Sequence, residues 1–101
     1  MTRKICLITG ASAGIGAATA RLAAQRGYDL ALTYNSDPTG AEAVAEAARA
    51  AGARVLVQKT DVANPEEIAA LFAAIDAEFG RLDALVNNAG VVDMTLSLIH
   101  I

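Results

Sequence analysis

One glycine-rich stretch decides the fold of this chain: residues 9–16 read Thr9-Gly10-Ala11-Ser12-Ala13-Gly14-Ile15-Gly16. An uninterrupted apolar run, Ile5-Cys6-Leu7-Ile8, lies at the centre of a strand predicted over residues 4–9, and such runs are typical of parallel strands buried on both faces. A helix is predicted to follow over residues 14–26. The N-terminus of a helix presents unpaired N–H groups and the positive end of its dipole. The stretch therefore predicts a strand–loop–helix unit with a site for an anion.

Strand and helix alternate along the rest of the chain. We predict strands over residues 4–9, 29–34, 54–58 and 82–86, and helices over residues 14–26, 38–51 and 65–79. Short loops between alternating strands and helices indicate a parallel sheet with right-handed crossovers. The fold class is therefore α/β: the N-terminal half of a Rossmann-like doubly wound parallel sheet (βαβαβαβ) with strand order 3-2-1-4.

Turn and capping residues agree with these boundaries. Gly27, Gly52 and Gly80 each follow a predicted helix, where a left-handed residue commonly ends it. Residues 64–67, Asn-Pro-Glu-Glu, supply a helix cap, and Asp37 does the same for the helix over 38–51. On the helix over 14–26, the spacing predicts a buried face, formed by Ile15, Thr19, Leu22 and Ala23.

Composition excludes several classes of protein. The chain has 101 residues, of which 54% are hydrophobic and 19% charged, so it is not disordered. Its longest apolar run, residues 68–75, is too short to cross a membrane, and the start does not resemble a signal peptide, so we expect a cytoplasmic protein. The net charge of −3 argues against nucleic-acid or anionic-membrane partners. The single cysteine, Cys6, is expected to be a buried apolar residue.

The three glycines of residues 9–16 have two interpretations. A P-loop is excluded because no Lys-Ser/Thr pair follows them, and their spacing differs from Gly-x-Gly-x-x-Gly. They could form a tight turn with no ligand. Their position between a strand and a helix favours phosphate binding.

A second motif, Asn87-Asn88-Ala89-Gly90, follows the fourth predicted strand. In the order 3-2-1-4, the first and fourth strands are neighbours, and the chain reverses direction between them. The glycine-rich loop and this motif would then flank one crevice at the carboxyl ends of their strands, where ligands bind in open α/β sheets. Either motif alone could be an ordinary turn.

With these motifs, the sequence resembles the short-chain dehydrogenase/reductase family (SDR). The resemblance rests on Thr-Gly-x-x-x-Gly-x-Gly at positions 9–16, on Asp61-Val62 after the third strand and on residues 87–90. It implies an oxidoreductase that uses NAD or NADP. By position, it implies that the pyrophosphate and adenosine ribose are held by Gly10, Ser12, Ala13, Gly14 and Ile15.

The same resemblance implies the remaining cofactor contacts. Asp61 would accept a hydrogen bond from the adenine amino group, beside the Val62 backbone, while Asn88, Ala89 and Gly90 would line the ribose and nicotinamide side. The alternative for Asp61 is a loop residue close to the cap of the next helix.

The end of the second strand bears on the choice of cofactor. An acidic residue there would bind the ribose hydroxyls of NAD and repel a 2′-phosphate. The sequence has Tyr34, Asn35 and Ser36, which tolerate a phosphate, and Asp37 is better explained as a helix cap. Ala13 counts the other way, since many NADP-preferring relatives carry a basic residue there. We expect NADP rather than NAD.

No catalytic or metal-binding residue is predicted. The resemblance implies catalysis by an Asn, a Ser and a Tyr-x-x-x-Lys pair, and neither Tyr28 nor Tyr34 has a lysine four residues later. We therefore expect the cofactor-binding half of an enzyme that transfers hydride between nicotinamide and a carbonyl or alcohol, inactive alone, whose parent is a homo-oligomer. A non-catalytic dinucleotide-binding module or sensor is the alternative; a methyltransferase fits poorly, because the second strand ends in Tyr34 rather than an acid.

The last six residues, Leu96-Ser97-Leu98-Ile99-His100-Ile101, depart from the pattern of the resembled family. They match the translation of a transposon end that serves as a sequencing adaptor. We therefore expect a dinucleotide-binding segment over residues 1–95 and a non-native tail over residues 96–101; the alternative is a genuine but unusual C-terminal sequence. The fourth strand would then be an apolar edge, which other chain normally covers.

Overall fold

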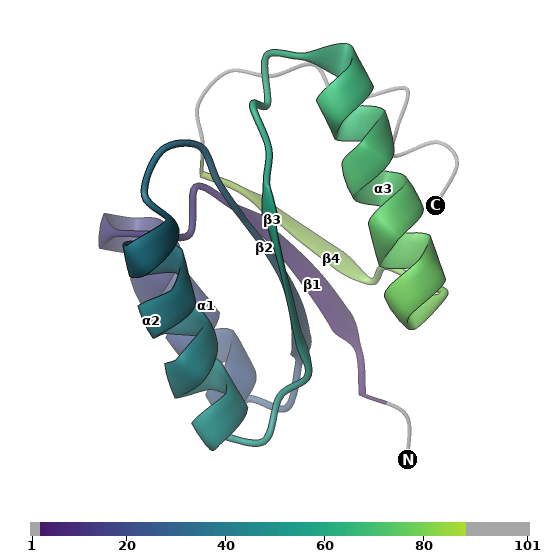
Figure 1. Cartoon of the computed structure of the whole chain (residues 1–101). Coiled ribbons are helices and arrows are strands. Elements are labelled where there is room, and N and C mark those ends of the chain that lie inside the picture. The colour runs from purple at the N-terminus through teal and green to yellow at the C-terminus, as the bar shows by residue number, and fades with distance from the viewer. Residues whose placement is uncertain (1–2, 89–101) are drawn as a thin grey trace.

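The computed structural model describes residues 3–88, which form one parallel sheet with helices on both faces (Figure 1). The strands are β1 (Ile5–Thr9), β2 (Asp29–Tyr34), β3 (Val55–Lys59) and β4 (Ala84–Asn87), and the helices are α1 (Gly14–Gln25), α2 (Pro38–Ala50) and α3 (Pro65–Phe79). The strand order is β3-β2-β1-β4, which confirms the predicted fold class and topology. The predicted tail over residues 96–101 lies outside the described residues.

Strand β1 lies at the centre of the sheet and sets its register. Cys6 is paired with Leu30 of β2 and with Ala84 of β4. Every residue of β1 is buried, as the uninterrupted apolar run predicts, and burial raises the pKa of the Cys6 thiol. Strands β3 and β4 begin later than predicted, at residues 55 and 84, and only partly bury their side chains.

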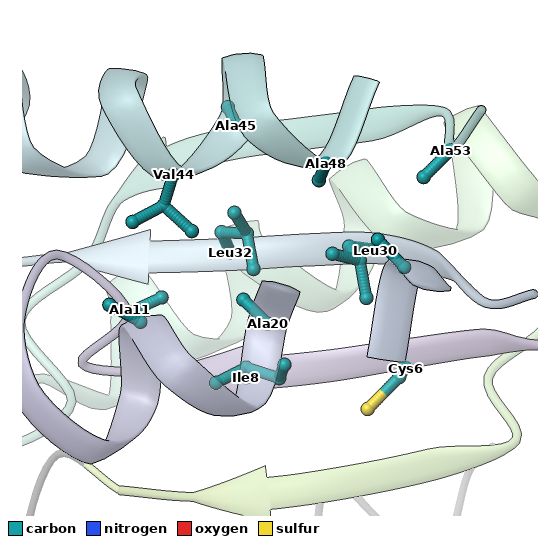
Figure 2. Close-up of a cluster of buried hydrophobic side chains, with 12 residues drawn as sticks. Cys6, Ile8, Ala11, Ala20, Leu30, Leu32, Val44, Ala45, Ala48 and Ala53 are labelled. Atoms are coloured by element: carbon teal, nitrogen blue, oxygen red, sulfur yellow. The ribbon is translucent and has the colours of Figure 1, made fainter. Parts of the chain in front are cut away.

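The helices divide between the two faces (Figure 1). Helices α1 and α2 cover one face, where their alanines pack against Ile8, Leu30 and Leu32 (Figure 2). Helix α3 covers the other face, where Ile68, Leu71 and Ile75 pack against Leu7 and Ala31. None of the helices within residues 3–88 is long and apolar enough to cross a membrane.

The predicted buried face of α1 was wrong. The residues that face the sheet are small: Gly16, Ala17, Ala20 and Ala24. Ile15 is 75% exposed and Leu22 is 50% exposed. The reason is the close approach of α1 to the loop before it, since a Cβ atom at Gly16 would collide with the carbonyl oxygen of Gly10.

The predicted terminating glycines and helix caps are confirmed, although α1 and α2 each end one residue earlier than predicted, at Gln25 and Ala50. Gly27, Gly52 and Gly80 have φ angles of 93°, 99° and 73°, in the left-handed region that suits glycine. The Asp37 side chain accepts from the N–H of Gly40 and caps α2. The Asn64 side chain caps α3 by accepting from Glu66 and Glu67, as its position before Pro65 predicts.

Two carboxylates hold the amino-terminal ends of the strands. Asp29, only 5% exposed, accepts from Arg3 Nε at 2.7 Å and from the backbone N–H of Arg54 at 2.9 Å. Asp83 accepts from the N–H of Ile5 at 2.8 Å. Each carboxylate therefore satisfies a backbone donor at or beside the start of a neighbouring strand.

Candidate functional site

The loop between β1 and α1 begins with an anchored turn. Gly10 has a φ of 63°. Its N–H donates to Thr33 Oγ1 at 3.3 Å, and the N–H of Ala11 donates to the carbonyl oxygen of Thr33 at 2.9 Å. Thr33 is buried in β2, so the start of the loop is fixed to the neighbouring strand.

Helix α1 begins without the capping that the other two described helices have. Its N-cap residue, Ala13, is extended, with a φ of −158°, and no side chain caps the helix. Its first turn holds no acidic residue, whereas α3 has two. Gly14 has a φ of 60°, and apart from its chain neighbours and the backbone of its own helix no atom lies within 4 Å of where a Cβ would be. An exposed helix N-terminus with open space and no carboxylate suits an anion.

The two predicted motifs meet at the carboxyl ends of β1 and β4. Asn88 Nδ2 donates to the carbonyl oxygen of Gly10 at 3.1 Å, and the N–H of Asn88 donates to Thr9 Oγ1 at 3.0 Å. Thr9 Oγ1 in turn donates to Asn87 Oδ1 at 3.0 Å. The structure thus places Asn88 beside the glycine-rich loop, whereas Ala89 and Gly90 lie outside the described residues.

Asp61 lies in the loop between β3 and α3. Its Oδ1 atom accepts from the N–H of Ala63 at 2.9 Å, and its own N–H donates to Glu67 Oε1 at 2.9 Å. These bonds place Asp61 close to the N-terminus of α3, a position that is compatible with both interpretations of this residue. The N–H of Thr60 donates to the carbonyl oxygen of Tyr34, so this loop also lies beside the end of β2. Val62 is half-buried against the α3 core.

The residues after β2 are mostly exposed. Tyr34 is half-buried, whereas Asn35 and Ser36 are exposed to solvent. Asp37 is the N-cap of α2, as predicted, with Oδ1 2.9 Å from the N–H of Gly40. The residues directly after β2 are therefore neutral, and the first carboxylate that follows, Asp37, is hydrogen-bonded to the start of α2.

Three residues that lie against the glycine-rich loop or Asn88 were absent from the predicted site: Thr9, Thr33 and Gly40. Thr9 and Thr33 are polar residues at or near the carboxyl ends of largely apolar strands, and such a position is visible in the sequence. Gly40 interrupts the alanine-rich sequence of α2 near the start of the helix, which is a weaker signal. Within residues 3–88, no group of three or more His, Cys, Asp and Glu side chains could hold a metal ion.

Comparison with known proteins gives consistent matches. The family described as short chain dehydrogenase matches residues 4–99. The chain is 48% identical over 90 residues to cis-4-hydroxycyclohexanecarboxylate dehydrogenase of Sinomonas cyclohexanicum, covering 89% of this chain and 35% of that protein. It is 41% identical over 88 residues to 3-oxoacyl-(acyl-carrier-protein) reductase of Staphylococcus aureus, covering 87% of this chain and 36% of that one.

Solved structures agree with the sequence relatives. Acetoin dehydrogenase from Enterobacter cloacae superimposes with a TM-score of 0.82 at 37% identity, over 89% of this chain and 36% of that one. The chain thus spans about a third of the length of these relatives. Because the family match covers nearly all of its residues, the chain belongs to the short chain dehydrogenase family.

Proposed function

We propose that the whole protein is an NAD(P)-dependent oxidoreductase that transfers hydride between nicotinamide and a carbonyl or alcohol. Residues 1–95 would supply its cofactor-binding part. The observation that carries this proposal is the uncapped N-terminus of α1, which lies at the carboxyl end of β1 beside Asn88. The names of the relatives, which are dehydrogenases and a reductase, support the same class of reaction.

The described residues fit a dinucleotide. Gly10 and Gly14 adopt left-handed conformations, and Gly14 borders open space, so a diphosphate can approach the backbone. Ser12, Ala13 and Ile15 would complete this binding loop. Because no side chain caps the start of α1, its backbone N–H groups can donate to a phosphate instead. When bound, the nicotinamide would give or accept the hydride.

The remaining cofactor contacts follow the predicted assignment. Asp61, whose second carboxylate oxygen is not required by the Ala63 bond, would accept from the adenine amino group beside Val62. Asn88 would hold the Gly10 carbonyl and, with Ala89 and Gly90, line the nicotinamide side. We assign no catalytic acid or base to this chain, so it should bind nucleotide without turning over substrate.

We also propose that NADP is preferred to NAD. Tyr34, Asn35 and Ser36 carry no negative charge toward a 2′-phosphate, and the Asp37 carboxylate accepts from Gly40. Calorimetric titration with NADPH and NADH tests both the presence of a dinucleotide site and the preference for NADP. Saturable binding of either nucleotide supports the site, and tighter binding of NADPH supports the preference. A folded protein that binds neither would refute the site, and equal or tighter binding of NADH would refute the preference.

A non-catalytic sensor would give the same titration. The two functions differ in the whole protein, which as an enzyme should oxidise NADPH or NADH in the presence of a panel of ketones and aldehydes. Nucleotide binding without turnover of any of them would favour the sensor. A cytoplasmic location and a homo-oligomeric whole protein stay predictions, which fractionation and size-exclusion chromatography would test.

A further inference from the structure

Gly40 occupies an unexpected position in the first turns of α2. Glycine is a poor helix former compared with alanine, which fills much of this helix. Gly40 is not among the glycines with positive φ, so its backbone conformation does not require glycine. Another reason must explain why no side chain is present here.

The surroundings of Gly40 supply that reason. A Cβ atom there would lie 2.5 Å from the carbonyl oxygen of Ser12 and would also collide with Asp37 Oδ2. The Asp37 side chain could rotate away, but the Ser12 oxygen belongs to the backbone. Helix α2 can therefore approach the glycine-rich loop this closely only because residue 40 has no side chain.

The contact bears on the peptide that leads into α1. The Ser12 carbonyl and the N–H of Ala13 belong to one planar trans peptide group and point in opposite directions. Because the Ser12 oxygen contacts α2, the N–H of Ala13 points away from α2. Ala13 is the N-cap residue of α1, so the close approach of Gly40 fixes the peptide at the entrance to the candidate anion site.

We propose that Gly40 is a positioning residue for the diphosphate-binding loop, acting through the Ser12 carbonyl. This inference rests on the proposed function, because it assumes that the loop binds a dinucleotide. A methyl group at residue 40 would move the Ser12 oxygen by about half an ångström, since real Cβ contacts are rarely shorter than 3.0 Å. Binding groups must be held to about that tolerance. Nucleotide affinity should therefore fall by about tenfold or more.

The experiment compares Gly40→Ala with Thr39→Ala, an exposed neighbour in the same turn that serves as the matched control. Backbone amide NMR spectra of the nucleotide-free protein report the loop, and calorimetric titration with NADPH and NADH reports affinity. We expect Gly40→Ala to shift the amide signals of residues 12–14 and to raise both dissociation constants. Thr39→Ala should do neither, and the amide signals of β3 should stay in place in both variants.

A double variant separates the two close contacts. In Asp37→Ser/Gly40→Ala the carboxylate is gone, but the Ser12 carbonyl remains, so affinity should stay low relative to Asp37→Ser alone. Affinity restored to that of Asp37→Ser would overturn the proposal, as would unshifted amides at 12–14 or global unfolding of Gly40→Ala. If the wild-type protein binds neither nucleotide, the proposed function fails, while the amide shifts still decide whether Gly40 positions the loop.

Discussion

Replacing Ala13 with aspartate should stabilise the fold and weaken nucleotide binding at the same time. Ala13 is the exposed N-cap residue of α1, its backbone is already extended, and no side chain caps the helix. An aspartate there can accept from the N–H of Ile15 or Gly16, as Asp37 does from Gly40 in α2. The same carboxylate would occupy the donors that the proposed diphosphate needs.

The two effects have opposite signs and measurable sizes. A good N-cap in place of alanine contributes about 1 kcal/mol, and an acid at the positive end of the dipole adds about 0.3–1 kcal/mol. A gain of about 1 kcal/mol raises the Tm of a domain of this size by roughly 4–8 °C. Against binding, two phosphate charges about 4 Å from the carboxylate cost about 2 kcal/mol even at the dielectric constant of water. That cost corresponds to roughly a thirtyfold loss of affinity.

Thermal unfolding without nucleotide and titration with NADPH and NADH measure the two effects separately. Ala13→Ser is the matched control, because it caps the helix without adding charge and should stabilise with a much smaller loss of affinity. If Ala13→Asp binds nucleotide as tightly as Ala13→Ser, the diphosphate does not lie at this helix terminus. If Ala13→Asp lowers the Tm, the N-terminus of α1 is already satisfied and our description of it is wrong.

Three further predictions concern the scaffold. Asp29→Asn should lower the free energy of unfolding by about 2 kcal/mol in urea, because hydrogen bonds to a charged acceptor contribute about 1.5–3 kcal/mol; an unchanged midpoint would contradict this. The Arg81 guanidinium and then the Ile5 N–H lower the pKa of Asp83, so its stabilisation is present above its unfolded pKa of about 3.9 and is lost as pH falls through the lower folded value. Below about pH 4, the Tm should therefore fall more steeply in wild type than in Asp83→Asn, and parallel curves would refute this. Leu22→Ala should cost under about 1 kcal/mol and Leu32→Ala about 2–5 kcal/mol; equal losses would mean that Leu22 is buried.

Much of the fold could be predicted because its signals are local. Gly80 ends α3 in the left-handed region, and Asn64 caps it, through chemistry confined to a few neighbouring residues. The parallel order follows from the alternation of strands and helices, which leaves few topologies. The starts of β3 and β4 were less accurate, because a strand begins where its partner offers hydrogen bonds, and that partner is distant in sequence.

The buried face of α1 could not be predicted from periodicity alone. Two faces of this helix carry small or apolar residues, and the larger ones, Ile15 and Leu22, suggested the wrong face. The deciding contact is between Gly16 and the Gly10 carbonyl, which depends on how the chain turns after β1. Thr33 was missed for a related reason, since its bonds to the loop exist only once β1 and β2 are in register.

The positions of the carboxylates around the sheet explain how a chain with a net charge of −3 can still offer a site for an anion. At the amino-terminal ends of the strands, Asp29 and Asp83 accept from backbone donors of neighbouring strands. At the carboxyl ends, Asp37 and Asp61 each accept from an N–H within three residues, which partly offsets their charge locally. The donors at the start of α1 have no such carboxylate. An anion that approaches the start of α1 therefore meets helix N–H groups with no competing carboxylate, and this is where the dinucleotide phosphates are proposed to bind.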